Sequence, residues 1–151
     1  MKYQNEVVID KPLEEVISKM DSAENMKYWQ KGLISYEHIH GTPGEVGAKM
    51  RLTYTMGNSE MAMTETIVKR NFPKEFHATY EAAGVWNMQH NYFSEVDATT
   101  TKWISKSEFK FSTFKMKFFG FIMPGAFKKQ SRKYMEAFKD FVEQGISVAD
   151  E

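Results

Sequence analysis

Apolar and charged positions near the C-terminus alternate with the period of an amphipathic helix. Between 126 and 144 apolar residues recur three or four positions apart, and charged residues fill most positions between them. This spacing places one apolar face along a helix. The face consists of Phe127, Tyr134, Met135, Phe138, Phe141 and Val142. We therefore predict a long helix over 126–144, ended by Gly145, that needs an apolar surface to lie on.

Most of the chain before this helix alternates with the period of two that is typical of β-strands. Turn-forming sequences rich in glycine, proline and asparagine separate the alternating segments. The segments are 3–10, 33–40, 49–56, 61–68, 76–80, 86–92 and 101–111. The pattern predicts seven strands in one antiparallel sheet.

Two short helices are predicted between the first and second strands. Asp10 and Pro12 favour a helix start, and the segment 13–20 carries an apolar stripe. Ser22 can cap a second short helix, which ends at Gly32. The predicted fold is therefore α+β: a curved, seven-stranded antiparallel sheet wraps around a long C-terminal helix. A chain of 151 residues is expected to form one domain over 1–151.

Composition narrows the possible functions. The 20 basic and 20 acidic residues balance, whereas a general nucleic-acid binder is usually basic, so we expect no nucleic-acid partner. The absence of cysteine excludes disulfides, thiolate metal sites and a cysteine nucleophile. No apolar run is long enough for a signal core or a membrane span. We expect a soluble, cytoplasmic protein.

Several stretches resemble one known superfamily. They are the strand-to-helix junction 7–16 (VVIDKPLEEV), Met26–Trp29, the loop 41–47, the strand segment 63–67 (MTETI) and the terminal helix. With these features the chain resembles the START-like superfamily, also called SRPBCC or helix-grip, which includes polyketide cyclase/dehydrase-like proteins. The resemblance implies a deep apolar cavity for lipids, polyketides or other hydrophobic ligands. It also implies that the protein is an enzyme, a carrier or a partner-binding domain.

The strand faces that point toward the last helix should line such a cavity. Hydrophobicity selects one face of each strand, and that choice is rich in methionine and aromatic residues, which suit an irregular apolar ligand. A filled core is the alternative. The predicted ligand-binding residues are Met50, Leu52, Tyr54, Met56, Met61, Met63, Ile67, Trp86, Met88, His90, Tyr92, Trp103, Phe109, Tyr134 and Phe138.

Two residues are candidates for acid–base chemistry. Glu65 shares a predicted face with Met61 and Met63, so an inward orientation would desolvate its carboxylate and raise its pKa. His90 shares a face with aromatic residues and could donate a proton or anchor a ligand. The alternatives are that Glu65 pairs with a base such as Arg51 or faces solvent, and that His90 is a satisfied core residue.

Metal and cofactor sites are not expected. His38 and His40 have a spacing compatible with metal binding, but the local sequence offers no third ligand. The glycine-rich loop 41–47 precedes a strand and lacks the Gly-Lys-Ser/Thr of a phosphate-binding loop. We predict no metal and no cofactor.

The segment 112–125 is rich in phenylalanine and lies in a basic region. Seven of the 12 phenylalanines fall between Phe109 and Phe127. One interpretation is a mobile lid over the cavity mouth. The others are a patch that contacts an anionic membrane and a short helix packed flat on the core. The lid residues would be Phe118, Phe119, Phe121, Ile122 and Met123.

Our leading functional hypothesis is a non-enzymatic protein that binds or carries a hydrophobic small molecule between the sheet and the last helix. The alternative is an enzyme similar to a polyketide cyclase or dehydratase that uses Glu65 or His90 as acid or base. A third class is a co-chaperone-like protein-interaction domain, which would carry an exposed apolar patch outside the cavity mouth.

Overall fold

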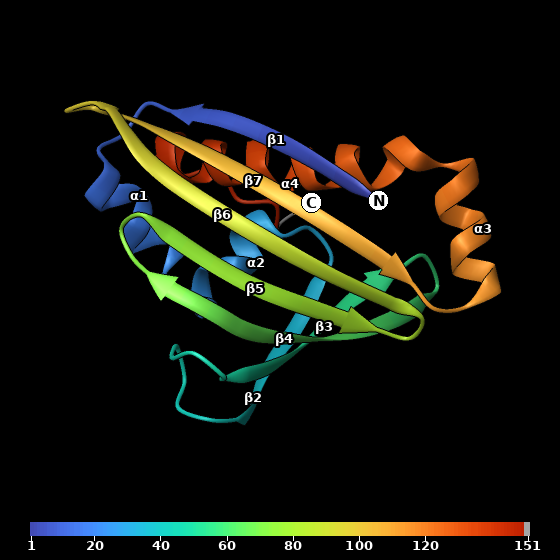
Figure 1. Cartoon of the computed structure of the whole chain (residues 1–151). Coiled ribbons are helices and arrows are strands. Elements are labelled where there is room, and N and C mark those ends of the chain that lie inside the picture. Colours follow the sequence, from blue (N-terminus) through green and yellow to red (C-terminus); the bar gives the residue numbers. More distant parts are fainter. Residues whose placement is uncertain (150–151) are drawn as a thin grey trace.

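A computed structural model describes residues 1–149 and contains one seven-stranded antiparallel sheet (Figure 1). The strands lie in the order β1-β7-β6-β5-β4-β3-β2. Their bounds are β1 (Lys2–Ile9), β2 (Leu33–His40), β3 (Lys49–Met56), β4 (Ser59–Asn71), β5 (Glu75–Ala82), β6 (Val85–Asp97) and β7 (Thr100–Phe111). The predicted sheet is confirmed, because each alternating segment forms one strand.

The helices also follow the predicted order. They are α1 (Leu13–Met20), the 3-10 turn η1 (Ala23–Asn25), α2 (Met26–Trp29), α3 (Phe114–Ile122) and α4 (Pro124–Gln144). The Ser22 hydroxyl caps η1 by accepting a hydrogen bond from the Asn25 backbone N–H at 3.3 Å. Gly145 ends α4 with a left-handed φ of 69°, a conformation that glycine adopts without steric cost.

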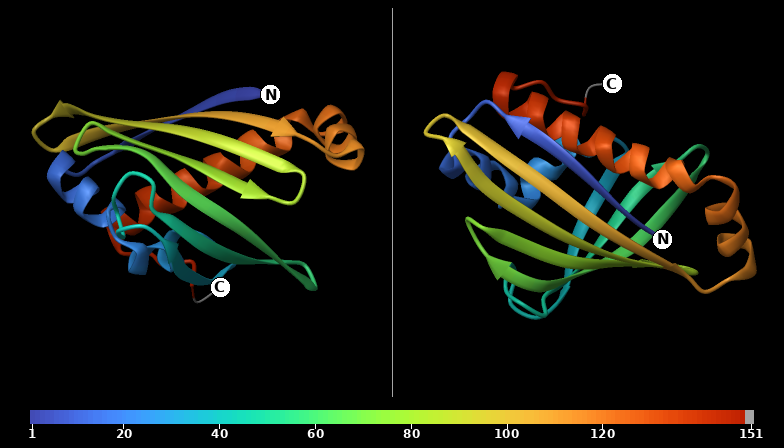
Figure 2. Two further views of the ribbon diagram at one scale, coloured as in Figure 1. Left: turned by 60° about the horizontal axis from the view of Figure 1, so that its bottom comes forward. Right: turned by 45° about the horizontal axis from the view of Figure 1, so that its top comes forward.

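The long helix α4 lies against one face of the curved sheet, which we call the inner face (Figure 2). Its contacts with strands are mainly with β1. The helices α1 and α2 lie near its C-terminal end, and α3 lies at the opposite end, beside the end of β7 (Figures 1 and 2). No helix within residues 1–149 is long and apolar enough to cross a membrane.

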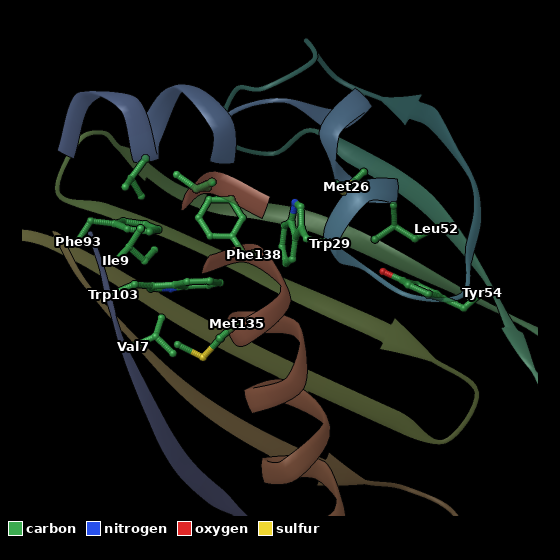
Figure 3. Packing of buried hydrophobic residues seen from close by; sticks show 12 residues of the cluster. Val7, Ile9, Met26, Trp29, Leu52, Tyr54, Phe93, Trp103, Met135 and Phe138 are labelled. Atoms are coloured by element: carbon green, nitrogen blue, oxygen red, sulfur yellow. The ribbon is translucent and has the colours of Figure 1, made fainter. Parts of the chain in front are cut away.

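The buried core fills the inner face at the end near α1 and α2 (Figure 3). Phe138 of α4 has no exposed surface, and its ring meets Trp29 edge-on at 5.2 Å and Trp103 edge-on at 5.4 Å. Phe93 stacks on Trp103 at 5.8 Å. These aromatic contacts join α2, α4 and the sheet, which is why the amphipathic face of α4 points to the sheet.

Candidate functional site

The pairing of the strands determines which side chains face α4. Trp103 packs against Phe138 of α4, so its side of β7 is the inner face. Val7 of β1 and Phe93 of β6 pair with Trp103 and share its face. Because side chains alternate along a strand, every second residue of each strand can be assigned from these positions.

The inner faces of β3 and β4 carry most of the residues that we predicted there. Tyr54 pairs with Met61, Leu52 with Met63, and Met50 with Glu65. Leu52 and Tyr54 are buried, while the three methionines are partly accessible and pack at the border of the core. Ile67, the next inward residue of β4, is buried as well.

Met56 lies at the end of β3 and is 54% exposed. Its predicted place in a cavity wall is wrong because β3 ends there and turns into β4.

The predicted face of β6 is wrong. Trp86, Met88, His90 and Tyr92 lie on the outer face, since Phe93 and its alternate neighbours take the inner one. There the His90 ring lies 4.7 Å from the ring of His77 on β5, and desolvation, followed by the charge of His77, lowers the pKa of His90.

Cation–π contacts explain why the apolar side of β6 can face outward. The Lys110 ammonium lies 4.8 Å from the Trp86 ring centre, and the Lys106 ammonium lies 5.5 Å from that of Tyr92. Such contacts cover aromatic rings at a surface. Hydrophobicity was therefore the wrong criterion for choosing the inner side of this strand.

Amide and hydroxyl side chains occupy the inner face where aromatic residues were predicted. Trp103 donates its indole N–H to the Asn91 side-chain oxygen at 3.0 Å, and Gln89 donates to the Asn87 side-chain oxygen at 3.0 Å. Ser105 pairs with Asn91 and is buried beside it. Sequence reasoning missed this polar belt, although Asn87, Gln89 and Asn91 alternate in phase with Phe93.

Glu65 is a carboxylate on the inner face of β4. It lies opposite Tyr80 of β5, whose hydroxyl hydrogen-bonds its side chain. Burial raises the pKa of Glu65, and the hydrogen bond from Tyr80 offsets part of this effect. The predicted alternative of a pair with Arg51 is wrong, because Arg51 lies opposite Thr64 on the other face and 3.9 Å from Glu37.

Two further tyrosines extend this cluster from other elements: Tyr54 interacts with Glu65, and Tyr134 interacts with Tyr54. Tyr54 of β3 donates its hydroxyl hydrogen to the Gln30 side-chain oxygen at 2.6 Å. Burial raises the pKa of Tyr54 above its ordinary value, and the charges of Tyr134 and Glu65 raise it further. Tyr134 of α4 has a pKa raised by burial. The phenols stay protonated at neutral pH, so they can donate hydrogen bonds to a ligand.

Glu65, Tyr80 and Tyr134 combine two properties that rarely occur together. As whole residues they are intermediate between buried and exposed, yet the surrounding protein desolvates their side chains enough to raise their pKa values. We expect such groups to line a recess of the molecule, between the inner face of the sheet and α4. The polar cluster of Glu65, Tyr54, Tyr80 and Tyr134 is therefore our candidate site.

The candidate site lies between two tightly packed regions. The core around Phe138 closes the end near α1 and α2. At the α3 end, Phe127 of α4 packs against Phe109 at 4.8 Å, Phe111 at 5.6 Å and Phe119 at 5.7 Å. Trp103 and Phe138 thus belong to the filled core, and Phe109 belongs to the aromatic contact at the other end.

Two surface hollows lie away from this site. One, of about 380 Å³, lies between β1 and α4 beside Val8, Arg132 and Lys139. The other, of about 300 Å³, lies at the β5–β6 turn beside Trp86 and Phe111. Neither contains Glu65 or Tyr80, so a ligand-sized cavity at the polar cluster stays a prediction.

The two histidines of β2 have different surroundings. The His38 Nε2 atom lies 2.6 Å from the Gly41 backbone oxygen, and a register shift separates His38 from His40. Within residues 1–149, no three histidine or acidic side chains gather closely enough to hold a metal ion.

The segment predicted as a lid forms the helix α3, which has no buried residue. Phe119 turns toward Phe127, whereas Phe118, Phe121, Ile122 and Met123 are 58%, 85%, 57% and 47% exposed. A short helix packed flat on the core was therefore the wrong alternative. Opening and closing of α3 over the site stays a prediction.

Solved structures of low sequence identity share this architecture. Ara h 8.0201 matches with a TM-score of 0.76 at 12% identity, over 94% of this chain and 97% of that one. The Zhui aromatase/cyclase from Streptomyces sp. R1128 matches with a TM-score of 0.76 at 12% identity, over 95% and 94%. The di-domain ARO/CYC BexL matches with a TM-score of 0.76 at 16% identity, over 95% of this chain and 46% of BexL.

No protein-family model matches the sequence, and no curated protein matches it. The structural likenesses therefore establish the architecture, which agrees with the resemblance noted in the sequence. The chain has a helix-grip fold.

Proposed function

We propose that this protein binds a hydrophobic small molecule that carries hydrogen-bonding oxygens, in the recess between the inner face of the sheet and α4. The observation that carries the proposal is the Glu65–Tyr80 pair, which is desolvated and still accessible. Desolvating a carboxylate opposes folding. A binding role gives a reason for keeping it there.

The composition of the recess supports an amphipathic ligand. Met50, Met61 and Met63 offer flexible, polarisable side chains that adapt to an irregular apolar shape. The phenols of Tyr54 and Tyr80 and the Glu65 carboxylate supply a few polar groups that can fix its orientation. A polycyclic phenol or ketone fits this combination better than a saturated hydrocarbon, which would leave the polar groups unpaired.

The comparisons support the same class of ligand. Two of the structural neighbours are described as the Zhui aromatase/cyclase and the di-domain ARO/CYC BexL, and the first of these names refers to the formation of aromatic rings. We extend this class of ligand to the present chain because of the shared fold and the cluster around Glu65. The ligand class is therefore part of the proposal.

Titration with 2-naphthol, a planar aromatic phenol, tests the proposal. Binding by calorimetry should weaken about threefold to tenfold in Tyr54→Phe and in Tyr80→Phe, because each variant removes one hydrogen-bonding hydroxyl. Tyr92→Phe removes a hydroxyl from the outer face and serves as the matched control. Equal affinities for all three variants, or no binding at all, would contradict the proposal.

A second candidate is an enzyme similar to a polyketide cyclase, and the raised pKa of Glu65 favours it. A desolvated carboxylate is a stronger base. It could take a proton from a carbon between two carbonyls, while the electron pair moves to a carbonyl oxygen that a tyrosine hydroxyl stabilises. His90 no longer enters this hypothesis because it lies on the outer face.

Turnover separates the two candidates. With a linear poly-β-ketone thioester as substrate, the enzyme hypothesis predicts a cyclised product. It also predicts that Glu65→Gln lowers the rate about a hundredfold or more. The carrier hypothesis predicts that the wild type and the variant both bind the thioester without converting it.

A further inference from the structure

The helix α3 exposes an unusually apolar side. Phe114 and Phe121 are 86% and 85% exposed, and Phe118 and Ile122 are more than half exposed. Phe114, Phe118 and Phe121 follow the spacing i, i+4, i+7, which places them in one stripe along the helix. Soluble proteins seldom leave so many large apolar side chains together in water.

The protein holds α3 so that this stripe points away from it. The Thr113 hydroxyl caps the helix by accepting from the Met116 backbone N–H at 3.2 Å. Gly120 faces β7 so closely that a Cβ there would lie 2.8 Å from the Phe111 ring. Because Gly120 and Phe119 turn inward, Phe114, Phe118 and Phe121 must turn outward.

Positive charge surrounds the apolar stripe. Lys115 and Lys117 flank it within α3, and between Glu108 and Glu136 the sequence has seven lysines and arginines and no acid. Four of these cations lie in the second and third turns of α4. A chain with no net charge thus concentrates its cations beside its most exposed apolar surface.

We propose that α3 is a docking helix for an anionic bilayer surface. Phenylalanines at one face and lysines beside them are the arrangement with which an amphipathic helix lies in the membrane interface. The aromatic rings enter the acyl boundary, and the lysine ammoniums stay with the anionic headgroups. The lack of a membrane-spanning helix within residues 1–149 agrees with a contact at the surface.

The charge pattern favours a bilayer over a second copy of the chain. A symmetric contact between two copies of α3 would bring two cationic segments together, and like charges oppose such a contact. An anionic surface instead gains about tenfold or less in affinity from each cation that comes near it, and Lys115 and Lys117 lie beside the stripe on α3.

Co-sedimentation of the full chain with vesicles tests this proposal. We expect binding to phosphatidylcholine vesicles that contain about one third phosphatidylserine, weak binding to phosphatidylcholine alone, and release when salt is raised to about 0.5 M. Phe114→Ser/Phe118→Ser/Phe121→Ser should weaken binding at least about tenfold. Lys115→Gln/Lys117→Gln should weaken it to a similar extent.

Matched variants control for general effects. Ile34→Ser/Val46→Ser removes exposed apolar side chains from β2 and the loop after it, and Lys27→Gln/Lys74→Gln removes two lysines outside the basic segment. Both should bind vesicles like the wild type. The proposal would be overturned if the control variants lost vesicle binding to the same extent or if the wild type did not bind vesicles. It would also be overturned if the protein formed a dimer that only the α3 variants dissociate. The 2-naphthol titration is independent of these outcomes.

Discussion

Glu65 and Tyr80 lie opposite each other on the β4–β5 ladder and share a side-chain hydrogen bond on the inner face of the sheet. Burial is the main cause of the raised pKa of Glu65, and the hydrogen bond from Tyr80 opposes it. The cost of desolvating this carboxylate is therefore offset mainly by one phenol. That relationship makes the pair sensitive to pH and to substitution.

We predict that Glu65→Gln changes how stability depends on pH. Because burial raises its pKa in the folded protein, Glu65 favours folding most below the ordinary glutamate pKa of 4.5, and this contribution is lost as pH rises through the raised value. Chemical denaturation from about pH 4 to about pH 8 should show the variant gaining stability relative to the wild type. Glu37→Gln, on the exposed edge strand, controls for removal of a charge. If the difference in unfolding free energy between Glu65→Gln and the wild type stayed constant across this pH range, the prediction would be contradicted.

The Trp103–Asn91 hydrogen bond should contribute measurably to stability. Asn91→Leu leaves the buried indole N–H of Trp103 without its acceptor, which costs about 1–3 kcal/mol. In thermal unfolding this corresponds to a loss of several degrees for a chain of this size. Gln4→Ala removes an amide from the exposed side of β1 and should change the midpoint little; a similar loss in both variants would show that the bond is unimportant.

Phe138 and Phe121 provide a matched test of the core. Phe138→Ala removes a ring with no exposed surface, between Trp29 and Trp103, and should cost about 3–5 kcal/mol of unfolding free energy. Phe121 is 85% exposed, so Phe121→Ala should change stability by less than about 0.5 kcal/mol. Urea denaturation measures both, and comparable losses would mean that α4 does not pack as described.

Two glycines near α3 should respond in opposite ways to alanine. Gly84 has φ of +76°, and a Cβ there would lie 2.9 Å from Thr113. Gly84→Ala should therefore destabilise by about 1 kcal/mol or more. A Cβ on Gly125 meets nothing within 4 Å, so Gly125→Ala should stabilise the start of α4 by up to about 1 kcal/mol. Differential scanning calorimetry measures the melting temperatures of both variants. If Gly84→Ala stabilised the protein and Gly125→Ala destabilised it, the described placement of α3 would be wrong.

The strongly periodic elements could be predicted from the sequence, and the reason is physical. The predicted strand 33–40 coincides with β2, and the predicted helix 126–144 falls within α4. In α4 the contrast between apolar and charged positions is sharp, so only one period fits. The helix begins at Pro124, two residues before the predicted start at 126, because proline is well accommodated in the first turn of a helix.

The site was only partly predictable because burial does not always follow hydrophobicity. On β4 the methionines and Glu65 were assigned to the correct face. On β6 the aromatic side faces outward under Lys106 and Lys110, and the amides Asn87 and Asn91 face inward because hydrogen bonds satisfy them. Those partners lie on other strands, and single-sequence alternation contains no information about them.

The structure of the Phe-rich segment 112–125 could not be predicted uniquely, for a related reason. Apolar residues occur on nearly every side of α3, so periodicity could not identify a buried face. Contact with Phe111 at Gly120 determines which side faces the protein, and that contact depends on the end of β7. The sequence alone therefore left the lid, the membrane patch and the packed helix as alternatives.

The most direct test of a ligand in the recess is a titration of methionine methyl resonances by nuclear magnetic resonance with 2-naphthol. The account predicts saturable shifts for Met50, Met61 and Met63, on the inner faces of β3 and β4, and none for Met88 on the outer face. Glu65→Gln should alter these shifts. Shifts confined to Met88 or to Met116 of α3, or no shift at any methionine, would contradict it.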